Sequence, residues 1–351
     1  MLAKKSGRRG GMVVTIHDVA RHAGVSPMTV SRVINAETNV RAETRARVAA
    51  SVAALRYSPN QAARSLASAG ATHIGIVYSN PSAAYLSEFL LGSLDQSTQS
   101  SARLVVERCE GAQGESAAIQ RLVEGGVDGV VLPAPLCDSE EALNAVREAK
   151  ISAVLVASGR PAPEFSAVSI DDFEAARAMT RHLLGLGHRR IGFIHGHPNQ
   201  TASAQRYRGF IEGMTEAGYS VGADQMAQGY FTYRSGLEAA EKLLGGFGPT
   251  AIFASNDDMA AATMAVAHRK GLEVPGDLSV AGFDDTPLAS IVWPELTTVR
   301  QPIAEMAREA VRLLIEQIRI RRAGNHAQPV HKTLEFTLVK RQSSASVNEV
   351  S

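Results

Sequence analysis

The sequence predicts a small all-α head followed by a two-lobed α/β body with parallel sheets. Three observations support this fold class. Apolar residues follow helical spacing in short blocks between Thr15 and Leu55, apolar runs alternate with amphipathic stretches from His73 onward, and basic residues are concentrated in the head. A chain of 351 residues is long enough for two or three domains with sizeable cores.

The charge distribution indicates a polyanionic partner for the head. Residues 1–66 contain eleven Lys or Arg and three Asp or Glu, a formal charge of +8, whereas residues 67–351 contain 25 and 32, a charge of −7. A basic head on an acidic body is the electrostatic footprint of nucleic-acid binding. A merely solvated charged face does not explain why the remainder of the chain has the opposite sign.

Composition excludes several classes of protein. No stretch approaches the roughly 18 uncharged apolar residues of a membrane helix, and the N-terminus lacks the apolar run of a secretory signal. Cys109 and Cys137 are too few for a disulfide framework and have no metal-ligand spacing, so we expect buried free thiols. These features predict a cytoplasmic protein with no membrane partner and no cofactor.

Residues 1–13 are expected to form a flexible basic arm, and residues 14–58 a helix-turn-helix domain. Gly24 lies where a helix C-cap fits, and Ser26 supplies an N-cap oxygen. Pro27 suits the first helical position, where a backbone N–H would have no partner. Only three residues separate the first two helices, which is the tight spacing of a helix-turn-helix.

The second helix of this domain has an outer face suited to a DNA groove. Its apolar residues Val30, Val33 and Ile34 are expected to point inward. The outer face then carries Pro27, Met28, Thr29, Ser31, Arg32 and Asn35. Arg can form two hydrogen bonds to guanine and Asn two to adenine, and a Met or Thr methyl packs on the thymine methyl. Thr29, Ser31 and Asn35 also suit contacts to phosphate, which position the protein on the DNA but do not specify the base sequence. An ordinary polar helix surface is the alternative interpretation.

Residues 71–341 alternate between strand and helix patterns. The candidate strands are Ile74–Tyr78, Leu104–Glu107, Gly129–Leu132, Ala153–Val156, Val168–Ile170, Ile191–Ile194, Ala251–Ala254 and Ser279–Phe283. The clearest candidate helices are Phe173–Leu184, Ala204–Glu216, Ser235–Leu244, Met259–Arg269 and Ile303–Ile320. This alternation predicts parallel sheets covered by helices, and roughly 270 residues are too many for one sheet, so two lobes are expected. Residues 342–351 are expected to form a disordered tail.

The head closely resembles that of LacI/GalR-family repressors. The resemblance is carried by TIHDVARHAGVSPMTVSRVIN and TRARVAASVAALRYSPNQAARSLAS, and it spans residues 14–68. It implies that residues 59–70 hold a hinge helix that enters the minor groove, where Leu66 wedges between the central base pairs and kinks the duplex. The predicted DNA-binding residues are Thr15, Ser26, Pro27, Met28, Thr29, Ser31, Arg32, Asn35, Asn60, Ala63 and Leu66. A buried linker leucine is the alternative for Leu66.

The body extends the resemblance to nearly the whole chain. HLLGLGHRRIGFIHG, AIFASNDDMAAATM and LSVAGFDDTPLAS look like family segments, and such bodies are similar to periplasmic sugar-binding proteins that clamp a ligand between two lobes. Ligand clefts lie at the carboxyl ends of strands, where Ser79, Asn256 and Asp284 are expected. The resemblance implies an effector-binding arginine at Arg208, a stacking ring at Phe231 and a further pocket ring at Tyr85. Ala157 departs from the pattern, because some sugar-responsive members have an acid there.

No catalytic residue and no metal site is predicted. His195 and His197 have no third ligand at metal spacing. The adjacent carboxylates Asp257 and Asp258 face different ways on one chain, and neither a G-x-G-x-x-G nor a G-x-x-x-x-G-K pattern occurs.

These features together predict a repressor. We expect a homodimer that binds near-palindromic double-stranded operator DNA and responds to a small effector, a sugar or a sugar acid. A purine-dependent repressor of the same family, a sugar-binding protein without a DNA role, and an enzyme acting on a sugar are the alternatives. The C-terminus lacks the leucine heptads that would join dimers into a coiled-coil tetramer.

Overall fold

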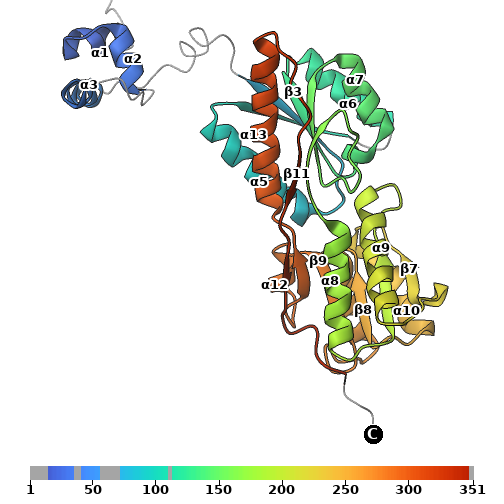
Figure 1. The fold of residues 1–351 in the computed structure, drawn as a ribbon. Helices are drawn as coiled ribbons and strands as arrows, with labels where there is room; N and C mark the ends of the chain where they lie inside the picture. Colours follow the sequence, from blue (N-terminus) through green and yellow to red (C-terminus); the bar gives the residue numbers. More distant parts are fainter. Residues whose placement is uncertain (1–14, 35–40, 56–71, 110–112, 348–351) are drawn as a thin grey trace, which may run out of the picture. The chain divides into compact units, whose positions relative to one another are not determined.

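The structure, a computed structural model, describes residues 15–34, 41–55, 72–109 and 113–347 (Figure 1). They belong to two compact units, one ending at Ala71 and the other beginning at Thr72. The expected arm, the expected hinge helix and the predicted DNA contacts Asn35, Asn60, Ala63 and Leu66 lie outside the described residues.

The head contains the three helices that the sequence predicts. They are α1 (Ile16–Ala23), α2 (Pro27–Ile34) and α3 (Ala42–Ala54). Gly24 ends α1 with a φ of 65°, the left-handed conformation that glycine adopts without strain. Ser26 begins α2, because its Oγ accepts a 3.2 Å hydrogen bond from the amide of Thr29. A small core holds the helices together and comprises Val19, Ala20, Ala23, Val30 and Val48.

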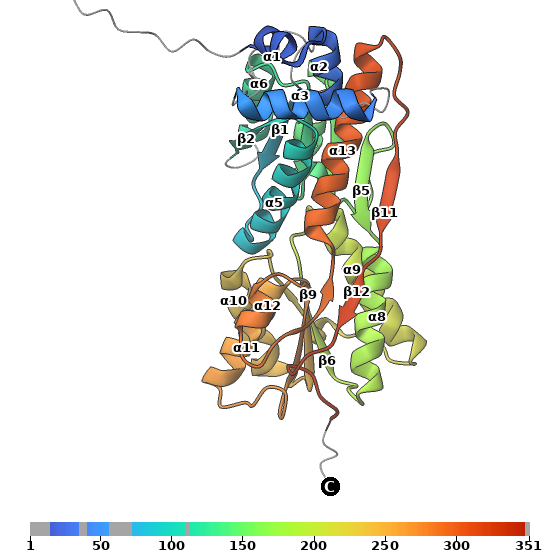
Figure 2. The ribbon, with the colours of Figure 1, turned by 90° about the vertical axis from the view of Figure 1, so that its left-hand side faces the viewer.

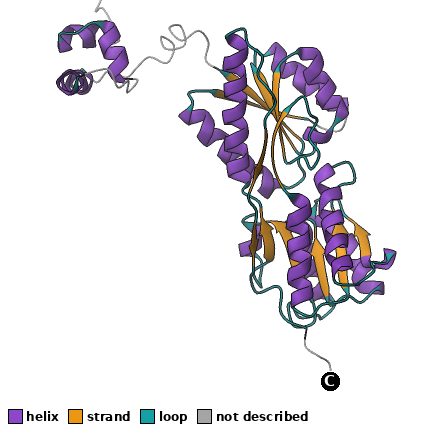
Figure 3. Ribbon diagram, in the orientation of Figure 1, coloured by secondary structure: helices purple, strands orange, loops and turns teal. Residues whose placement is uncertain are grey.

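The body has two lobes, each built on a six-stranded sheet (Figure 3). The N-terminal lobe has the order β11-β5-β4-β3-β1-β2 and is parallel throughout. Its strands are β1 (His73–Tyr78), β2 (Arg103–Arg108), β3 (Gly129–Pro133), β4 (Ser152–Val156), β5 (Ser166–Ile170) and β11 (His331–Leu334). The prediction of a parallel sheet is therefore confirmed for this lobe.

The C-terminal lobe has the order β12-β10-β9-β8-β6-β7, with only the β10–β12 pair antiparallel. Its strands are β6 (Ile191–His195), β7 (Met226–Gln228), β8 (Ala251–Ala254), β9 (Ser279–Asp284), β10 (Thr297–Arg300) and β12 (Thr337–Val339). All eight candidate strands are present. The strands that the sequence analysis missed are β7, β10, β11 and β12, which are short or carry exposed polar residues.

Paired helices cover both sheets. In the N-terminal lobe α5 (Ala83–Gln99) packs with α13 (Ile303–Arg322), and α6 (Gln113–Glu124) with α7 (Glu140–Ala149), next to the short η1 (Leu136–Asp138). In the C-terminal lobe α8 (Asp172–Gly185) packs with α9 (Thr201–Glu216), and α10 (Tyr233–Gly246) with α11 (Asp257–Arg269). The short η2 (Ala223–Gln225) and α12 (Leu288–Ile291) complete this lobe. Of the described helices, none is long and apolar enough to span a bilayer.

The chain of the body crosses between the lobes at three places. The crossings lie between β5 and α8, between β10 and α13, and between β11 and β12 (Figure 1). The C-terminal strands β11 and β12 therefore extend both sheets. Because β5 and β10 each continue directly into the other lobe, the carboxyl ends of the parallel strands of each sheet face the opposite lobe.

The prediction of a disordered tail is wrong for residues 342–347, which pack along the C-terminal lobe. Ser343 is fully buried, and its Oγ donates to the carbonyl of Val280 at 2.6 Å and accepts from the amide of Thr297 at 2.8 Å. The carbonyl of Ala345 lies 3.0 Å from Nε2 of His188. Ser343 and Ser344 are hydrogen-bonding partners of strands β9 and β10, and composition alone does not reveal such partners.

Candidate functional site

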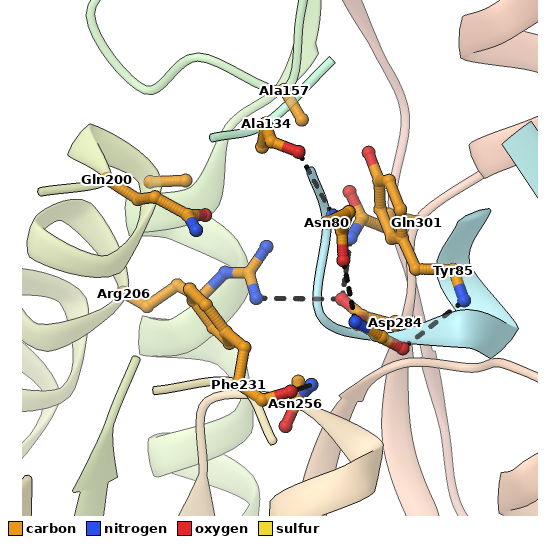
Figure 4. A pocket seen from close by; sticks show the side chains of 12 residues that line it. Asn80, Tyr85, Ala134, Ala157, Gln200, Arg206, Phe231, Asn256, Asp284 and Gln301 are labelled. Atoms are coloured by element: carbon orange, nitrogen blue, oxygen red, sulfur yellow. Dashed lines mark hydrogen bonds and ion pairs between the residues drawn. The ribbon is translucent and has the colours of Figure 1, made fainter. Parts of the chain in front are cut away.

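A pocket lies between the two lobes of the body, and both lobes contribute side chains to it (Figure 4). The N-terminal lobe supplies Asn80, Ser82, Tyr85, Ala134 and Ala157. The C-terminal lobe supplies Gln200, Ala202, Arg206, Phe231, Asn256 and Asp284, and Gln301 comes from the crossing before α13. The pocket is therefore complete only when the lobes come together.

Arg206 is the buried cation of this pocket. Its Nε donates to Oδ1 of Asp172 at 2.8 Å, and its Nη1 donates to the carbonyl of Ser255 at 2.6 Å. The guanidinium carbon lies 3.7 Å from the ring centroid of Phe283, a close cation–π contact. These contacts hold the guanidinium in one orientation, with Nη1 3.6 Å from Oδ1 of Asp284.

Asp284 lies at the end of β9 in a strained conformation, with a φ of 110°. Its Oδ1 accepts a 2.6 Å hydrogen bond from Nε2 of Gln301. Burial raises the pKa of its carboxyl to about 7, although Arg206 and the Gln301 bond favour the charged form. Backbone strain and a raised pKa in one buried residue are typical of a functional site.

Phe231 and Asn256 form one wall of the pocket. Phe231 has a φ of 61°, and its carbonyl accepts a 3.1 Å hydrogen bond from Nδ2 of Asn256. Oδ1 of Asn256 caps α11 by accepting from the amide of Met259 at 3.0 Å. Both ends of the Asn256 amide are therefore engaged in positioning the wall. Gly196 leaves space for the ring, since a Cβ there would lie 2.0 Å from Cζ of Phe231.

Two polar atoms in the pocket are buried without a partner. Oη of Tyr85 and Oε1 of Gln301 accept and donate no hydrogen bond, and their residues are 5% and 3% exposed. A buried unpaired polar atom costs about 1–3 kcal/mol. Two of them facing one pocket indicate a polar ligand that supplies the missing partners.

Hydrogen bonds join the lobes on either side of the pocket. Ser82 Oγ donates to Oδ2 of Asp258 at 2.6 Å. Asp138 Oδ2 accepts from the amide of Thr201 at 2.7 Å, and Oδ1 of Asp138 accepts from Ser158 at 2.6 Å. We call the Ser82–Asp258 and Asp138–Thr201 bonds the cross-lobe clasps. Burial raises the pKa of both aspartates against the opposing effect of these bonds.

The prediction of Arg208 as a pocket residue is wrong. Arg208 is exposed, and its Nη1 donates to Oε1 of Gln205 at 3.1 Å. Two residues correspond to about 200° around a helix, so Arg206 and Arg208 face nearly opposite directions. Helical spacing in the sequence could have identified Arg206 as the inward-facing arginine. Arg206 is four residues from both Ala202 and Phe210, which are buried on the same face of the helix.

Ser79 also lies outside the pocket lining. Asn80 and Ser82, the next polar residues along the chain, line the pocket instead. Of the six predicted effector-binding residues, the structure brings four to the pocket: Tyr85, Phe231, Asn256 and Asp284. Sequence reasoning missed Asn80, Gln200, Arg206 and Gln301, and Gln301 lies on a crossing that no local pattern reveals.

The outer face of α2 is the candidate DNA-reading surface. Met28 is 65% exposed and Arg32 is exposed, whereas Val30 is fully buried, so these three residues face the directions expected from the sequence. Thr29 is partly buried, and its Oγ1 lies 2.9 Å from Oγ of Ser26. In α1, the amide of Thr15 donates to Oδ2 of Asp18 at 2.9 Å, which places Thr15 at the helix N-terminus.

The histidines that could suggest a metal site are engaged by aromatic rings. His195 lies 4.6 Å from the ring of Tyr207, and His197 lies 5.7 Å from that of Tyr230, both between centroids. Within the ranges that the structure describes, no group of three or more His, Cys, Asp or Glu side chains could hold a metal ion.

Two family models match the chain. Residues 15–60 match the model described as bacterial regulatory proteins, lacI family. Residues 180–344 match the model described as periplasmic binding protein-like domain.

Relatives match nearly the full length of the chain. Catabolite control protein A of Priestia megaterium is 35% identical over 306 residues, which cover 86% of this chain and 92% of that protein. The HTH-type transcriptional repressor PurR of Actinobacillus pleuropneumoniae is 33% identical over 346 residues, which cover 96% of this chain and 100% of that protein.

Solved structures share the fold of the chain. The transcriptional regulator CelR in complex with cellobiose aligns with a TM-score of 0.71 at 31% identity and covers 94% of this chain and 99% of its own. The lac repressor dimer bound to operator and the anti-inducer ONPF aligns with a TM-score of 0.72 at 29% identity and covers 95% of this chain and 100% of its own.

Proposed function

The chain belongs to the LacI family of bacterial regulatory proteins, and from that premise we propose that it is a repressor that binds operator DNA as a homodimer and is controlled by a small effector. The observation that carries the proposal is the interlobe pocket with two unpartnered buried polar atoms, in the same chain as a helix-turn-helix. A ligand that fills this pocket bridges the lobes and thereby changes the stability of one body conformation relative to another.

In this proposal, α2 reads the major groove of each half-site. Met28 and Arg32 are exposed on its outer face, with Thr29 and Ser31 beside them. Leu66, which lies outside the described residues, is proposed as the minor-groove wedge. The lac repressor of similar fold is a dimer bound to operator, and a two-fold protein suits a near-palindromic site.

We propose that the dimer forms through one apolar face of the body. Exposed apolar side chains occur on α5, on β2, and at and directly after the end of α12, and α5 and α12 face the same side of the body (Figure 2). They are Leu91, Leu94, Val105, Val106, Ile291 and Trp293. Exposed apolar residues that gather on one face mark interaction surfaces.

The effector is proposed to be a sugar. Asp284, Tyr85 and Gln301 offer hydrogen-bonding atoms to hydroxyl groups, and the ring of Phe231 suits the apolar C–H face of a sugar. CelR, with the same fold, was solved with cellobiose. Arg206 takes the role first expected of Arg208, and Asn256 positions Phe231 as well as lining the pocket.

A purine is the second candidate effector. The relatives of the chain include repressors named PurR, at 33% identity over 96% of this chain. The ring of Phe231 suits a flat base as well as a sugar. We also propose that the pocket binds its ligand without transforming it, since the relatives compared above are named as transcription regulators.

The test begins with selection of operator DNA from a random library by the full-length protein. Anisotropy titrations with the selected site and with a scrambled site then measure specific binding. A thermal-shift screen against sugars, sugar acids, sugar phosphates, nucleosides and purine bases identifies the effector, because a ligand at about 100 times its Kd stabilises the fold by roughly 2.7 kcal/mol. Lack of discrimination between the two DNA sites contradicts the regulator proposal. Loss of operator binding on adding the ligand indicates induction, and a gain indicates corepression.

A further inference from the structure

The interlobe pocket has one positive charge and several negative ones around it. Arg206 is the only Lys or Arg among the described side chains that line it. Its guanidinium is bonded to Asp172, to the carbonyl of Ser255, and lies next to Asp284. Asp172 is 3% exposed and lies behind Arg206, outside the pocket lining. The guanidinium thus already has two acidic neighbours before any ligand arrives.

We propose that Asp172 neutralises Arg206 and so makes the pocket selective for uncharged ligands rich in hydrogen-bond donors, against phosphates and carboxylates. This inference rests on the proposed function, because it concerns the effector of the same pocket. It identifies the effector class as a neutral polyol or a similar uncharged molecule. Sugar phosphates and sugar acids are excluded.

The electrostatic argument follows from the distances. Two unit charges 4 Å apart interact by about 4 kcal/mol at the effective dielectric constant near a protein surface, about 20. An anion near Arg206 is attracted by the guanidinium, but it is repelled by Asp172, 2.8 Å from that guanidinium, and above about pH 7 also by the ionised Asp284, 3.6 Å from it. The attraction and the repulsion therefore largely cancel, and the anion still loses its hydration shell on entering the pocket.

The free hydrogen-bonding atoms point to the same class of ligand. Oε1 of Gln301 is an acceptor without a donor, and Oη of Tyr85 is a hydroxyl without any partner. Asp284 adds carboxylate oxygens at the same pocket. The Gln301 oxygen and the Asp284 carboxylate require donors from the ligand, whereas the Tyr85 hydroxyl donates as well as accepts. A ligand hydroxyl also does both and suits all three groups, but an ionised phosphate or carboxylate supplies a partner only for the Tyr85 hydroxyl.

The titration of Asp284 responds to both members of the Asp172–Arg206 pair. Burial raises the pKa of Asp284 to about 7, Arg206 at 3.6 Å lowers it, and the charge of Asp172 raises it. A charge that enters the pocket therefore interacts with both Arg206 and Asp172.

The experiment uses the full-length protein and inorganic phosphate as the anionic probe, at pH 8, with Tm as the readout. The variants are Asp172→Asn, which keeps an acceptor for Nε of Arg206, and Asp172→Asn combined with Arg206→Gln. Glu216→Gln is the matched control, because Glu216 pairs with Arg177 and Arg181 on the same two helices, outside the pocket. Phosphate bound by the basic head is common to all variants and cancels in the comparison.

We expect phosphate to stabilise Asp172→Asn saturably, with an apparent Kd at least about tenfold below that of the wild type, a change of roughly 1.4 kcal/mol. The double variant should lose this response, and Glu216→Gln should behave like the wild type. Equal phosphate responses of the wild type and Asp172→Asn overturn the proposal. If Asp172→Asn does not fold, the test compares the wild type with Arg206→Gln. Saturable stabilisation of the wild type by phosphate that is lost in Arg206→Gln overturns the proposal. A wild type that phosphate does not stabilise in this way supports it.

A second arm compares glucose with glucose 6-phosphate and gluconate, and hypoxanthine with inosine monophosphate, by calorimetry on the wild type. Within any pair that binds, the neutral member should bind at least about tenfold more tightly. Tighter binding of an anionic member overturns this inference while leaving the regulator proposal intact. Failure of the regulator proposal is recognised separately, by the absence of sequence-specific DNA binding.

Discussion

The hydroxyl of Thr201 lies 2.9 Å from both carboxylate oxygens of Asp138, and the two residues belong to different lobes of the body. The amide of Thr201 donates to the same carboxylate. Each such hydrogen bond contributes about 0.5–1.5 kcal/mol, and somewhat more when one partner is charged. The closed arrangement of the lobes is therefore stabilised by the protein itself, and an effector adds to a preference already present.

Removing the Thr201 hydroxyl is expected to weaken effector binding. Thr201→Val keeps the shape of the side chain but loses the bonds from Oγ1 to Asp138. We expect the Kd of the effector to rise by about three- to tenfold, corresponding to roughly 1 kcal/mol. Calorimetry with the effector from the thermal-shift screen measures this change.

The control for this prediction lies on the same helix. Within the described residues, the hydroxyl of Thr215 donates only to the carbonyl of Ile211 in the same helix, so Thr215→Val should leave the Kd unchanged. Equal effects of the two substitutions contradict a role for the Asp138–Thr201 clasp in closure.

A methyl group at Gly196 is expected to displace the ring of Phe231. A Cβ there would lie 2.0 Å from Cζ of that ring. Overpacking of this kind costs about 1–3 kcal/mol, and the displaced ring no longer forms the pocket wall. Gly196→Ala should therefore lose the effector-dependent rise in Tm while retaining operator binding. Gly245→Ala is the control, because a Cβ there meets nothing within 4 Å. An unchanged effector response in Gly196→Ala would contradict the assignment of Phe231 as a wall of the effector pocket.

The stability of the protein is expected to depend on the charge of Asp284. Burial raises its folded pKa to about 7, and an unfolded aspartate titrates near 3.9, roughly. Because the folded pKa is the higher one, its contribution to stability is fully present below about pH 4 and is lost as the pH rises through about 7. Arg206, Asp172, Asp257 and Asp258 are the charged groups that influence this titration.

Asp284→Asn removes this titration. Relative to the wild type, its free energy of unfolding should rise by up to about 3 kcal/mol between pH 5 and pH 8, since one pKa unit is worth about 1.4 kcal/mol. Urea unfolding at a series of pH values measures the difference. A difference that stays constant across this range contradicts the titration of Asp284.

Two substitutions in α2 should separate DNA reading from stability. Met28 is 65% exposed, so Met28→Ala is expected to leave Tm unchanged and to reduce discrimination between operator and scrambled DNA by about 1–3 kcal/mol. Val30 is fully buried, so Val30→Ala should lower the stability of the head by roughly 2 kcal/mol. Anisotropy and thermal unfolding together test the pair, and a loss of Tm in Met28→Ala would show that this side chain is structural.

A charge on the proposed dimer face is expected to separate the subunits. Trp293 is 85% exposed, and a large aromatic residue at the centre of an interface commonly contributes 2 kcal/mol or more. Trp293→Arg should therefore raise the dimer Kd by at least about thirtyfold. Sedimentation equilibrium measures it, with Tyr230→Arg as a control at an exposed aromatic residue that follows the edge strand β7. An unchanged dimer Kd places the interface elsewhere.

Part of the pocket could be predicted from the sequence because its residues are marked locally. Asp284 and Asn256 follow apolar strands, and the carboxyl ends of parallel strands meet at one edge. Arg206 and Gln301 lack such a mark. Arg206 was missed in favour of its exposed neighbour Arg208, since helical phase decides between them, and Gln301 becomes a pocket residue only through a crossing between lobes.

By itself, the sequence determined the helix-turn-helix, the eight strands in apolar runs and the division between head and body, because caps, turns and periodicity act between neighbours in the chain. Only the tertiary structure determined which distant residues bond to one another. Asp172 pairs with Arg206, Asp138 with Thr201, and the serines of the C-terminal segment with β9 and β10. These contacts join residues separated by 34 to 63 positions, and no local pattern encodes which distant group will satisfy a buried charge or amide.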